Sequence, residues 1–153
     1  MSKTAINLDL IGGLDGLRMI ITDFYQRIFN DAMIAYLFTG QSQQRLIERE
    51  VEWTARLLGA HQIEYKGQSL KQAHSKHPIR KGHFFRRHQL LAETLKTHQV
   101  PQEVQDMWLT HSLSLIHVIL GAAHTDQACE MTSQTSGQAS TSTPGLWIST
   151  REE

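Results

Sequence analysis

Four of the nine histidines of this 153-residue chain lie within one short stretch, residues 70–89. They are His74, His77, His83 and His88. Histidine is a common metal ligand and the side chain that most readily exchanges protons near neutral pH. This stretch is therefore the first place to look for chemistry. A structural zinc site needs four ligands, usually including cysteine, and the chain has a single cysteine.

The spacing of these histidines does not favour a shared metal site. His74 and His77 could lie on one helix face, but Pro78 disfavours helical backbone at the residue before it. His83 and His88 are five residues apart, which places them about 140° apart around a helix. Three of the four are then expected to be solvated surface residues. The remaining interpretation for the fourth is a lone imidazole that binds a metal already chelated by another group, as in haem proteins.

Helices must position these residues, because almost every periodic segment has helical spacing. From Leu14, apolar residues recur every three or four positions, and Gly12-Gly13 would break any earlier helix. These residues are Leu17, Ile20, Ile21, Phe24 and Ile28. A tight corner carrying Phe38 should follow. Ser42 is then a good N-cap for a helix that reaches about Leu58 and ends at Gly59.

The second half of the chain continues this pattern. A loop leads into a short helix that should end near His77, and a further helix is expected over residues 80–97. Pro101 suits the first turn of the last helix, whose apolar face extends to Ile119. No run of alternating polar and apolar residues is long enough to predict a strand. The predicted fold class is all-α.

Composition limits the possible partners and locations. Lys+Arg and Asp+Glu both number 15, so neither nucleic acid nor an anionic membrane is expected as a main partner. No apolar run approaches the length needed to cross a bilayer, and the first residues do not resemble a signal peptide. We expect a cytoplasmic protein with one domain over residues 1–124. Residues 125–153 are rich in Ser, Thr, Gln and Gly and are predicted to be disordered.

The order of several short motifs resembles the truncated haemoglobins, most closely their first group. The motifs are IGGLDGL, DFYQRIF, YLFTG, RLIEREVEW, LLGA followed by YKGQSLKQAH, and HPIRKGHF. No one motif is specific, but their order and spacing match over about residues 10–120. The resemblance implies a shortened globin in which two antiparallel helix pairs sandwich a haem, taken as haem b.

The resemblance also implies a role for individual residues. His74 falls on the iron ligand, with its second ring nitrogen held by a backbone carbonyl or water. The residues implied to contact the haem are Phe38, Arg49, Leu70, His74, Ile79 and Phe84, and Arg49 could pair with a propionate. The implied distal pocket holds Phe24, Tyr25, Leu46 and Glu50, and the Tyr25 hydroxyl could donate to bound dioxygen.

Two residues depart from the family pattern. Glu50 interrupts an apolar stripe, so it either turns outward to pair with Arg45 or Arg49 or lies at the distal pocket. Burial without a partner would raise the pKa of its carboxyl group. Arg87 stands where the family usually has an apolar distal residue. It could pair with Glu50 or mark a local shift of its helix, and the sequence leaves both alternatives open.

Two kinds of function are compatible with these residues. The first is a haem protein that binds dioxygen, nitric oxide or carbon monoxide, for oxygen binding or transport or for nitric oxide detoxification, with nitric oxide dioxygenase or peroxidase-like chemistry as a side activity. Nitric oxide conversion would require a separate reductase, because the chain has no flavin or nicotinamide motif. The second is a helical sensor or interaction module that retains the globin fold without gas chemistry.

Overall fold

The structure is a computed structural model, and it describes residues 5–124. Its elements are α1 (Ala5–Asp9), α2 (Gly13–Phe29), the 3₁₀ helix η1 (Ala35–Phe38), α3 (Gln43–Leu57), α4 (Leu70–His74), α5 (Lys81–Thr97), α6 (Gln102–Ser114) and α7 (Ile116–His124). The all-α prediction is confirmed, since no strand occurs among residues 5–124. None of the helices described is long and apolar enough to cross a membrane. The predicted tail, 125–153, lies outside the described residues.

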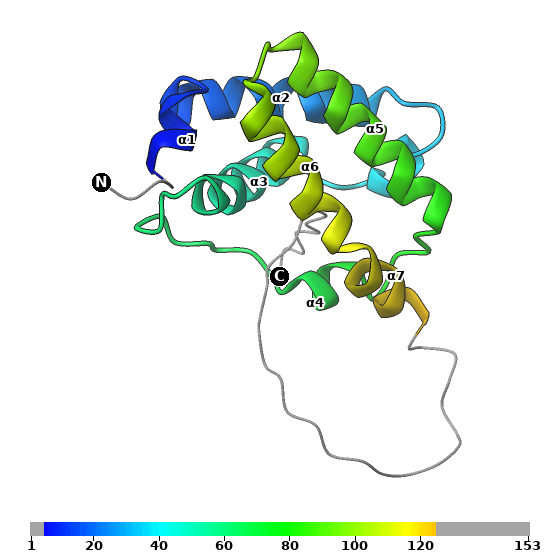
Figure 1. Cartoon of the computed structure of the whole chain (residues 1–153). Coiled ribbons are helices and arrows are strands. Elements are labelled where there is room, and N and C mark those ends of the chain that lie inside the picture. The colour runs from blue at the N-terminus through cyan, green and yellow to red at the C-terminus, as the bar shows by residue number, and fades with distance from the viewer. Residues whose placement is uncertain (1–4, 125–153) are drawn as a thin grey trace.

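The helices form two layers. Helix α2 packs against both α3 and α5, and α5 packs against α6. Helix α6 crosses in front of α3, and α4 and α7 lie together at the foot of the molecule (Figure 1). The short helix α4, which carries His74, is joined to α3 by the non-helical residues 58–69. This arrangement places α4 beside α7, away from the packed pairs α2–α3 and α2–α5.

The start of α2 depends on glycine. Gly12 caps the helix with a φ of 91°, and Gly13 also has a positive φ, a region that side chains disfavour. A Cβ on Gly16 would overlap the carbonyl oxygen of Ile11. The predicted apolar face of α2 is confirmed, because all five residues that predicted it are buried, together with Tyr25.

Helix α3 begins and ends where the sequence predicts. The Ser42 hydroxyl accepts a hydrogen bond from the Arg45 amide at 3.3 Å, as an N-cap does. The helix ends with Leu58 as its C-cap, and Gly59 follows with a φ of 111°. Glu50 lies within α3, on the side of the helix that is buried.

Two helices end earlier than predicted. Helix α4 stops at His74, and residues 75–77 form a turn closed by a bond from the His77 amide to the His74 carbonyl. The expected last helix is divided at Leu115 into α6 and α7. There the Ser114 hydroxyl donates to the His111 carbonyl, which the Leu115 amide would otherwise use, and that amide bonds to Ser112 instead.

Candidate functional site

His74 differs from the other three histidines of its stretch in its environment. Its side chain is 0 % exposed, whereas His77, His83 and His88 are half-buried. The expectation that these three are surface residues is therefore only partly met. The Nδ1 atom of His74 donates to the Leu70 carbonyl at 2.5 Å, one turn earlier in α4. With the proton on Nδ1, the lone pair of the ring is on Nε2.

Burial also fixes the charge of His74. It is the main cause that lowers the pKa of this imidazole to about 3, with the charges of Arg87 and His77 acting in the same direction, while the Leu70 carbonyl opposes the shift. The ring is therefore neutral near pH 7. Neutral imidazole with one nitrogen held by a backbone carbonyl is the form that binds metal ions. Among residues 5–124, no group of three or more His, Cys, Asp or Glu side chains could hold a metal ion.

The apolar residues predicted around a haem are buried. They are Phe24, Phe38, Leu46, Leu70, Ile79 and Phe84. The ring of Phe38 stands edge-on to that of Tyr25, with the centroids 6.5 Å apart, and it lies 5.6 Å from the ring of Phe29. Phe29 is half-buried and was not among the predicted site residues, although it continues the face of α2 by one turn from Tyr25.

Glu50 turns inward rather than toward its own helix surface. Its side chain is 1 % exposed and lies between two partners from other helices. The Tyr25 hydroxyl donates to Glu50 Oε2 at 3.3 Å, and Arg87 Nη2 donates to Glu50 Oε1 at 3.3 Å. Of the alternatives that the sequence left open, the structure has Glu50 paired with Arg87. Arg49 instead bonds to Glu52 at 2.7 Å on the half-buried side of α3.

The three polar residues Tyr25, Glu50 and Arg87, here termed the α2–α3–α5 cluster, have unusual electrostatics. Burial raises the pKa of Glu50 to about 7, although the charge and hydrogen bond of Arg87 and the Tyr25 hydroxyl oppose the shift. Burial, followed by the Glu50 charge, raises the pKa of Tyr25 well above its usual range. Near neutral pH, Glu50 therefore exchanges a proton readily, whereas Tyr25 remains a neutral donor.

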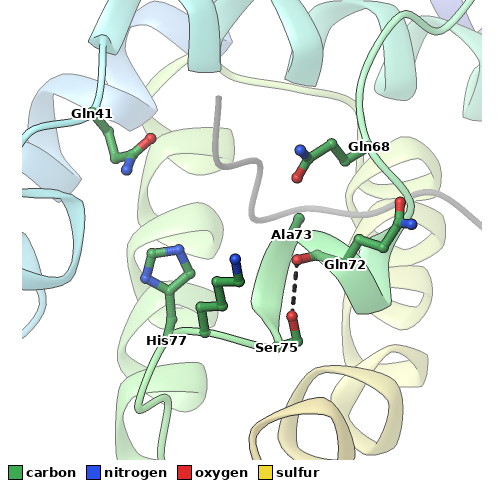
Figure 2. Close-up of a pocket in the computed structure, with 7 residues that line it drawn as sticks. Gln41, Gln68, Gln72, Ala73, Ser75 and His77 are labelled. Carbon is green, nitrogen blue, oxygen red and sulfur yellow. Dashed lines mark hydrogen bonds between the residues drawn. The ribbon is translucent and has the colours of Figure 1, made fainter. Parts of the chain in front are cut away.

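A polar cleft lies beside His74. It has a volume of about 410 Å³ and is lined by Gln41, Gln68, Gln72, Ala73, Ser75, Lys76 and His77. Figure 2 shows Gln41 and His77 on one side of this hollow and Gln68 and Gln72 on the other, with the Ser75 hydroxyl bonded to the Gln72 carbonyl. Lys76 lines this cleft and stands two residues after His74, and no motif in the sequence pointed to it.

The chain is similar to known globins. Residues 7–121 match the family model described as bacterial-like globin. The chain belongs to this family. It is also 35 % identical over 95 residues to the group 1 truncated haemoglobin GlbN of Mycolicibacterium paratuberculosis. The aligned residues make up 62 % of this chain and 69 % of that protein. The chain is thus a truncated globin of group I, as its motifs predicted.

Solved structures share this fold. The 2/2 haemoglobin of a Synechococcus species, in a cyanomet state with covalently attached haem, gives a TM-score of 0.68 at 18 % identity and covers 74 % of this chain and 97 % of that one. The truncated haemoglobin of Tetrahymena pyriformis in its Fe(III) form gives 0.65 at 20 % identity and covers 74 % and 95 %. These similarities establish the two-over-two sandwich of this truncated globin.

The described residues fit the haem that the globin family implies. The family has one imidazole as the protein ligand, and His74 is a buried, neutral imidazole whose second nitrogen is already held. The apolar residues predicted to contact the porphyrin are buried in the same core. This truncated globin is therefore a haem globin, of a class that binds diatomic gases.

Proposed function

We propose that this truncated globin holds haem b through His74 Nε2 and binds dioxygen reversibly, with carbon monoxide and nitric oxide as competing ligands. The observation that carries the proposal is the buried imidazole of His74, whose Nδ1 donates to the Leu70 carbonyl. Haem iron, when bound, supplies the open coordination position at which a diatomic gas binds. Every other contribution comes from the residues of the chain.

The backbone of α4 orients the proposed ligand. Because the Leu70 carbonyl holds Nδ1, the imidazole cannot rotate freely and its Nε2 lone pair keeps one direction. The hydrogen bond also strengthens the ring as a donor to a metal. Burial keeps His74 neutral, so no proton competes for Nε2 near pH 7. Phe38 and Phe84, which are buried, would help to keep water away from a bound haem.

The opposite side of the site supplies a hydrogen-bond donor. A dioxygen ligand would carry partial negative charge, which a neutral O–H would stabilise without having to ionise. The Tyr25 hydroxyl has this role in our proposal, and the raised pKa of its phenol keeps it protonated. In the structure this hydroxyl donates to Glu50, so donation to a gas requires it to leave the carboxylate or to be shared with it.

Lys76 is proposed as the partner of a haem propionate. It lines the polar cleft beside His74, and its ammonium group is exposed and mobile enough to reach a carboxylate at the haem edge. The sequence assigned this contact to Arg49, which stays a prediction. Arg49 already has a carboxylate partner in Glu52, at 2.7 Å, so a propionate would have to compete with it.

Removal of the imidazole tests the proposal directly. His74→Ala should abolish stoichiometric haem binding, measured as the haemochrome after titration with haemin, whereas His77→Ala and His83→Ala should each retain one haem per chain. In His74→Gly, free imidazole should restore the Soret band, because it replaces the missing ligand. Normal haem affinity and an unchanged iron–histidine stretch in His74→Ala would show that another residue is the ligand.

The same titration separates this function from the alternative of a helical sensor or interaction module. A purified chain with no Soret band, even after haemin is added, would favour the module. Nitric oxide conversion to nitrate would need electrons from a separate reductase, and we propose dioxygen binding as the simpler function. A cytoplasmic location remains a prediction from sequence.

A further inference from the structure

Arg87 is a fully charged side chain in the interior of the α2–α3–α5 cluster. Its side chain is 2 % exposed, and its guanidinium carbon lies 4.7 Å from the centroid of the Phe24 ring. A guanidinium does not lose its proton in proteins. Burying such a charge is costly unless a counter-charge and hydrogen bonds compensate it. The presence of Arg87 here therefore calls for an anion nearby.

The carboxyl group of Glu50 is an anion that lies at a long distance from this guanidinium. Its Oε1 accepts from Arg87 Nη2 at 3.3 Å, a long distance for a charge-assisted bond, which is usually 2.7–2.9 Å. The other oxygen is shared with the Tyr25 hydroxyl, also at 3.3 Å. The Glu50 carboxyl group that contacts the guanidinium is thus held by long bonds, and it can itself become neutral by taking up a proton.

The charge of Arg87 also reaches His74. It is one of the causes that lower the pKa of the His74 imidazole. The groups facing Glu50 are Tyr25 from α2, Arg87 from α5 and Tyr65 from residues 58–69. Both tyrosines are neutral near pH 7, so Arg87 is the one full positive charge among these groups.

We propose that Arg87 and Glu50 form a charge-regulated binding site for a small inorganic anion next to the position where gas ligands bind. This inference rests on the haem site proposed above and adds to it a preference for anionic ligands. When Glu50 is neutral, the guanidinium attracts an anion that binds the ferric haem. When Glu50 is ionised, it neutralises the guanidinium and repels the anion.

The site should respond to pH near neutrality. Since burial raises the pKa of Glu50 to about 7, the carboxyl group is mostly neutral below this pH and mostly ionised above it. Anion affinity should therefore be higher below pH 7 and fall as the pH rises. Hydroxide also competes for ferric iron at higher pH, so the alkaline transition of each variant is titrated without fluoride and its fluoride affinity is corrected for that competition.

Fluoride is the probe, because it binds ferric haem as an anion and its binding changes the visible spectrum. In the ferric haem-loaded full chain at pH 6, where the Glu50 carboxyl group is mostly neutral, Arg87→Met should weaken fluoride binding by roughly tenfold to a hundredfold. At pH 8, where this carboxyl group is mostly ionised, Glu50→Gln should strengthen fluoride binding by roughly tenfold, since the cation is no longer neutralised. Between pH 6 and pH 8, wild-type fluoride affinity, corrected for hydroxide, should fall more steeply than that of Glu50→Gln.

Two neighbouring substitutions serve as matched controls. Arg86→Met removes the same charge one residue away, where Arg86 pairs with Asp31 at 2.7 Å on the partly exposed side of α5. Glu48→Gln makes the matching change on α3, at a residue whose partner is the exposed Gln44. Both should leave the fluoride dissociation constant within about twofold of wild type, because solvent screens these charges. Carbon monoxide binding to the ferrous form should change less than fluoride binding in every variant.

The outcomes separate this inference from the haem assignment. Haem content is measured first, and a chain that binds no haem would refute the proposed function rather than the anion site. If haem binds but fluoride affinity is the same in wild type, Arg87→Met and Glu50→Gln, the pair serves only to join α3 to α5 and the anion site is refuted. If Arg87→Met fails to fold, Glu50→Gln alone decides, since unchanged or weaker fluoride binding in that variant contradicts the proposal.

Discussion

The two sides of the candidate site are built from different kinds of contact. On one side, His74 is held by a backbone carbonyl one turn earlier in its own helix. On the other side, Tyr25, Glu50 and Arg87 come from α2, α3 and α5 and hold one another through side chains. The first side needs only a local helical turn. The second needs three helices packed in the correct register, with two buried charges that must meet.

This difference determines where a substitution should have its largest effect on folding. A local contact can be lost with little effect on the surrounding helices. A buried charge that loses its partner affects the whole core, because no water replaces the partner.

Glu50→Met should reduce the unfolding free energy of the haem-free chain by about 3–5 kcal/mol, since it leaves Arg87 buried and uncompensated. Arg87→Met should cost less, because the remaining carboxyl group can take up a proton and the guanidinium cannot lose one. Urea unfolding at pH 8 measures both variants under conditions where the Glu50 carboxyl group of the wild type is mostly ionised. If the unfolding free energy falls equally in the two variants, the difference between a carboxyl group that can be neutralised and a guanidinium that cannot does not determine the stability of the α2–α3–α5 cluster.

These contacts also mark how far the sequence could predict the molecule. The buried face of α2, the N-cap Ser42 and the glycine after α3 follow from local patterns, and all three were predicted correctly. The family resemblance singled out His74, and its buried, neutral state supports that choice. In each case the signal in the sequence is a local one: a helical period, a cap or a short motif.

The rest depends on contacts that sequence spacing does not encode. Glu50 and Arg87 are 37 positions apart, so their pairing appears only once α3 and α5 are packed together. The division of the last helix at Leu115 depends on which carbonyl the Ser114 hydroxyl selects. The polar cleft with Lys76 joins the corner at Gln41 to the segment around α4, which no local pattern predicts.

Tyr25→Phe tests whether the α2–α3–α5 cluster acts on the gas ligand. Loss of one charge-assisted hydrogen bond costs about 1.5–3 kcal/mol, so dioxygen release should become roughly tenfold faster or more. Stopped-flow measurement of dioxygen release from the ferrous protein checks this. Tyr36→Phe is the control, because Tyr36 is exposed and its hydroxyl bonds to His83 at 3.0 Å. The same rate in wild type and Tyr25→Phe would mean that Tyr25 serves only Glu50.

The pH dependence of dioxygen release should be a smaller effect on the same side. Below pH 7 the Glu50 carboxyl group is mostly neutral, and the Tyr25 hydroxyl is free to donate to the ligand. As the pH rises through about 7, the carboxylate forms and draws that hydroxyl to itself. Release should then become about two- to tenfold faster, the effect of one ordinary hydrogen bond. Glu50→Gln should show no such rise, and a wild-type rate that is flat between pH 6 and pH 8 would contradict the mechanism.

The smallest expected effect concerns the His74 side, at the polar cleft. Lys76→Gln removes the proposed propionate partner but leaves the imidazole and its Leu70 carbonyl in place. An exposed ion pair contributes up to about 1 kcal/mol, so haem loss should become at most about fivefold faster. Transfer of haem to an excess of an apo-globin acceptor measures this rate. Lys71→Gln is the matched control, since Lys71 is an exposed lysine on α4 that does not line the cleft.

Arg49→Gln makes the test a comparison of two candidate partners for the propionate. If Arg49→Gln speeds haem loss and Lys76→Gln does not, the propionate contact belongs to Arg49, as the sequence predicted. Glu52 would then give up its partner when haem binds.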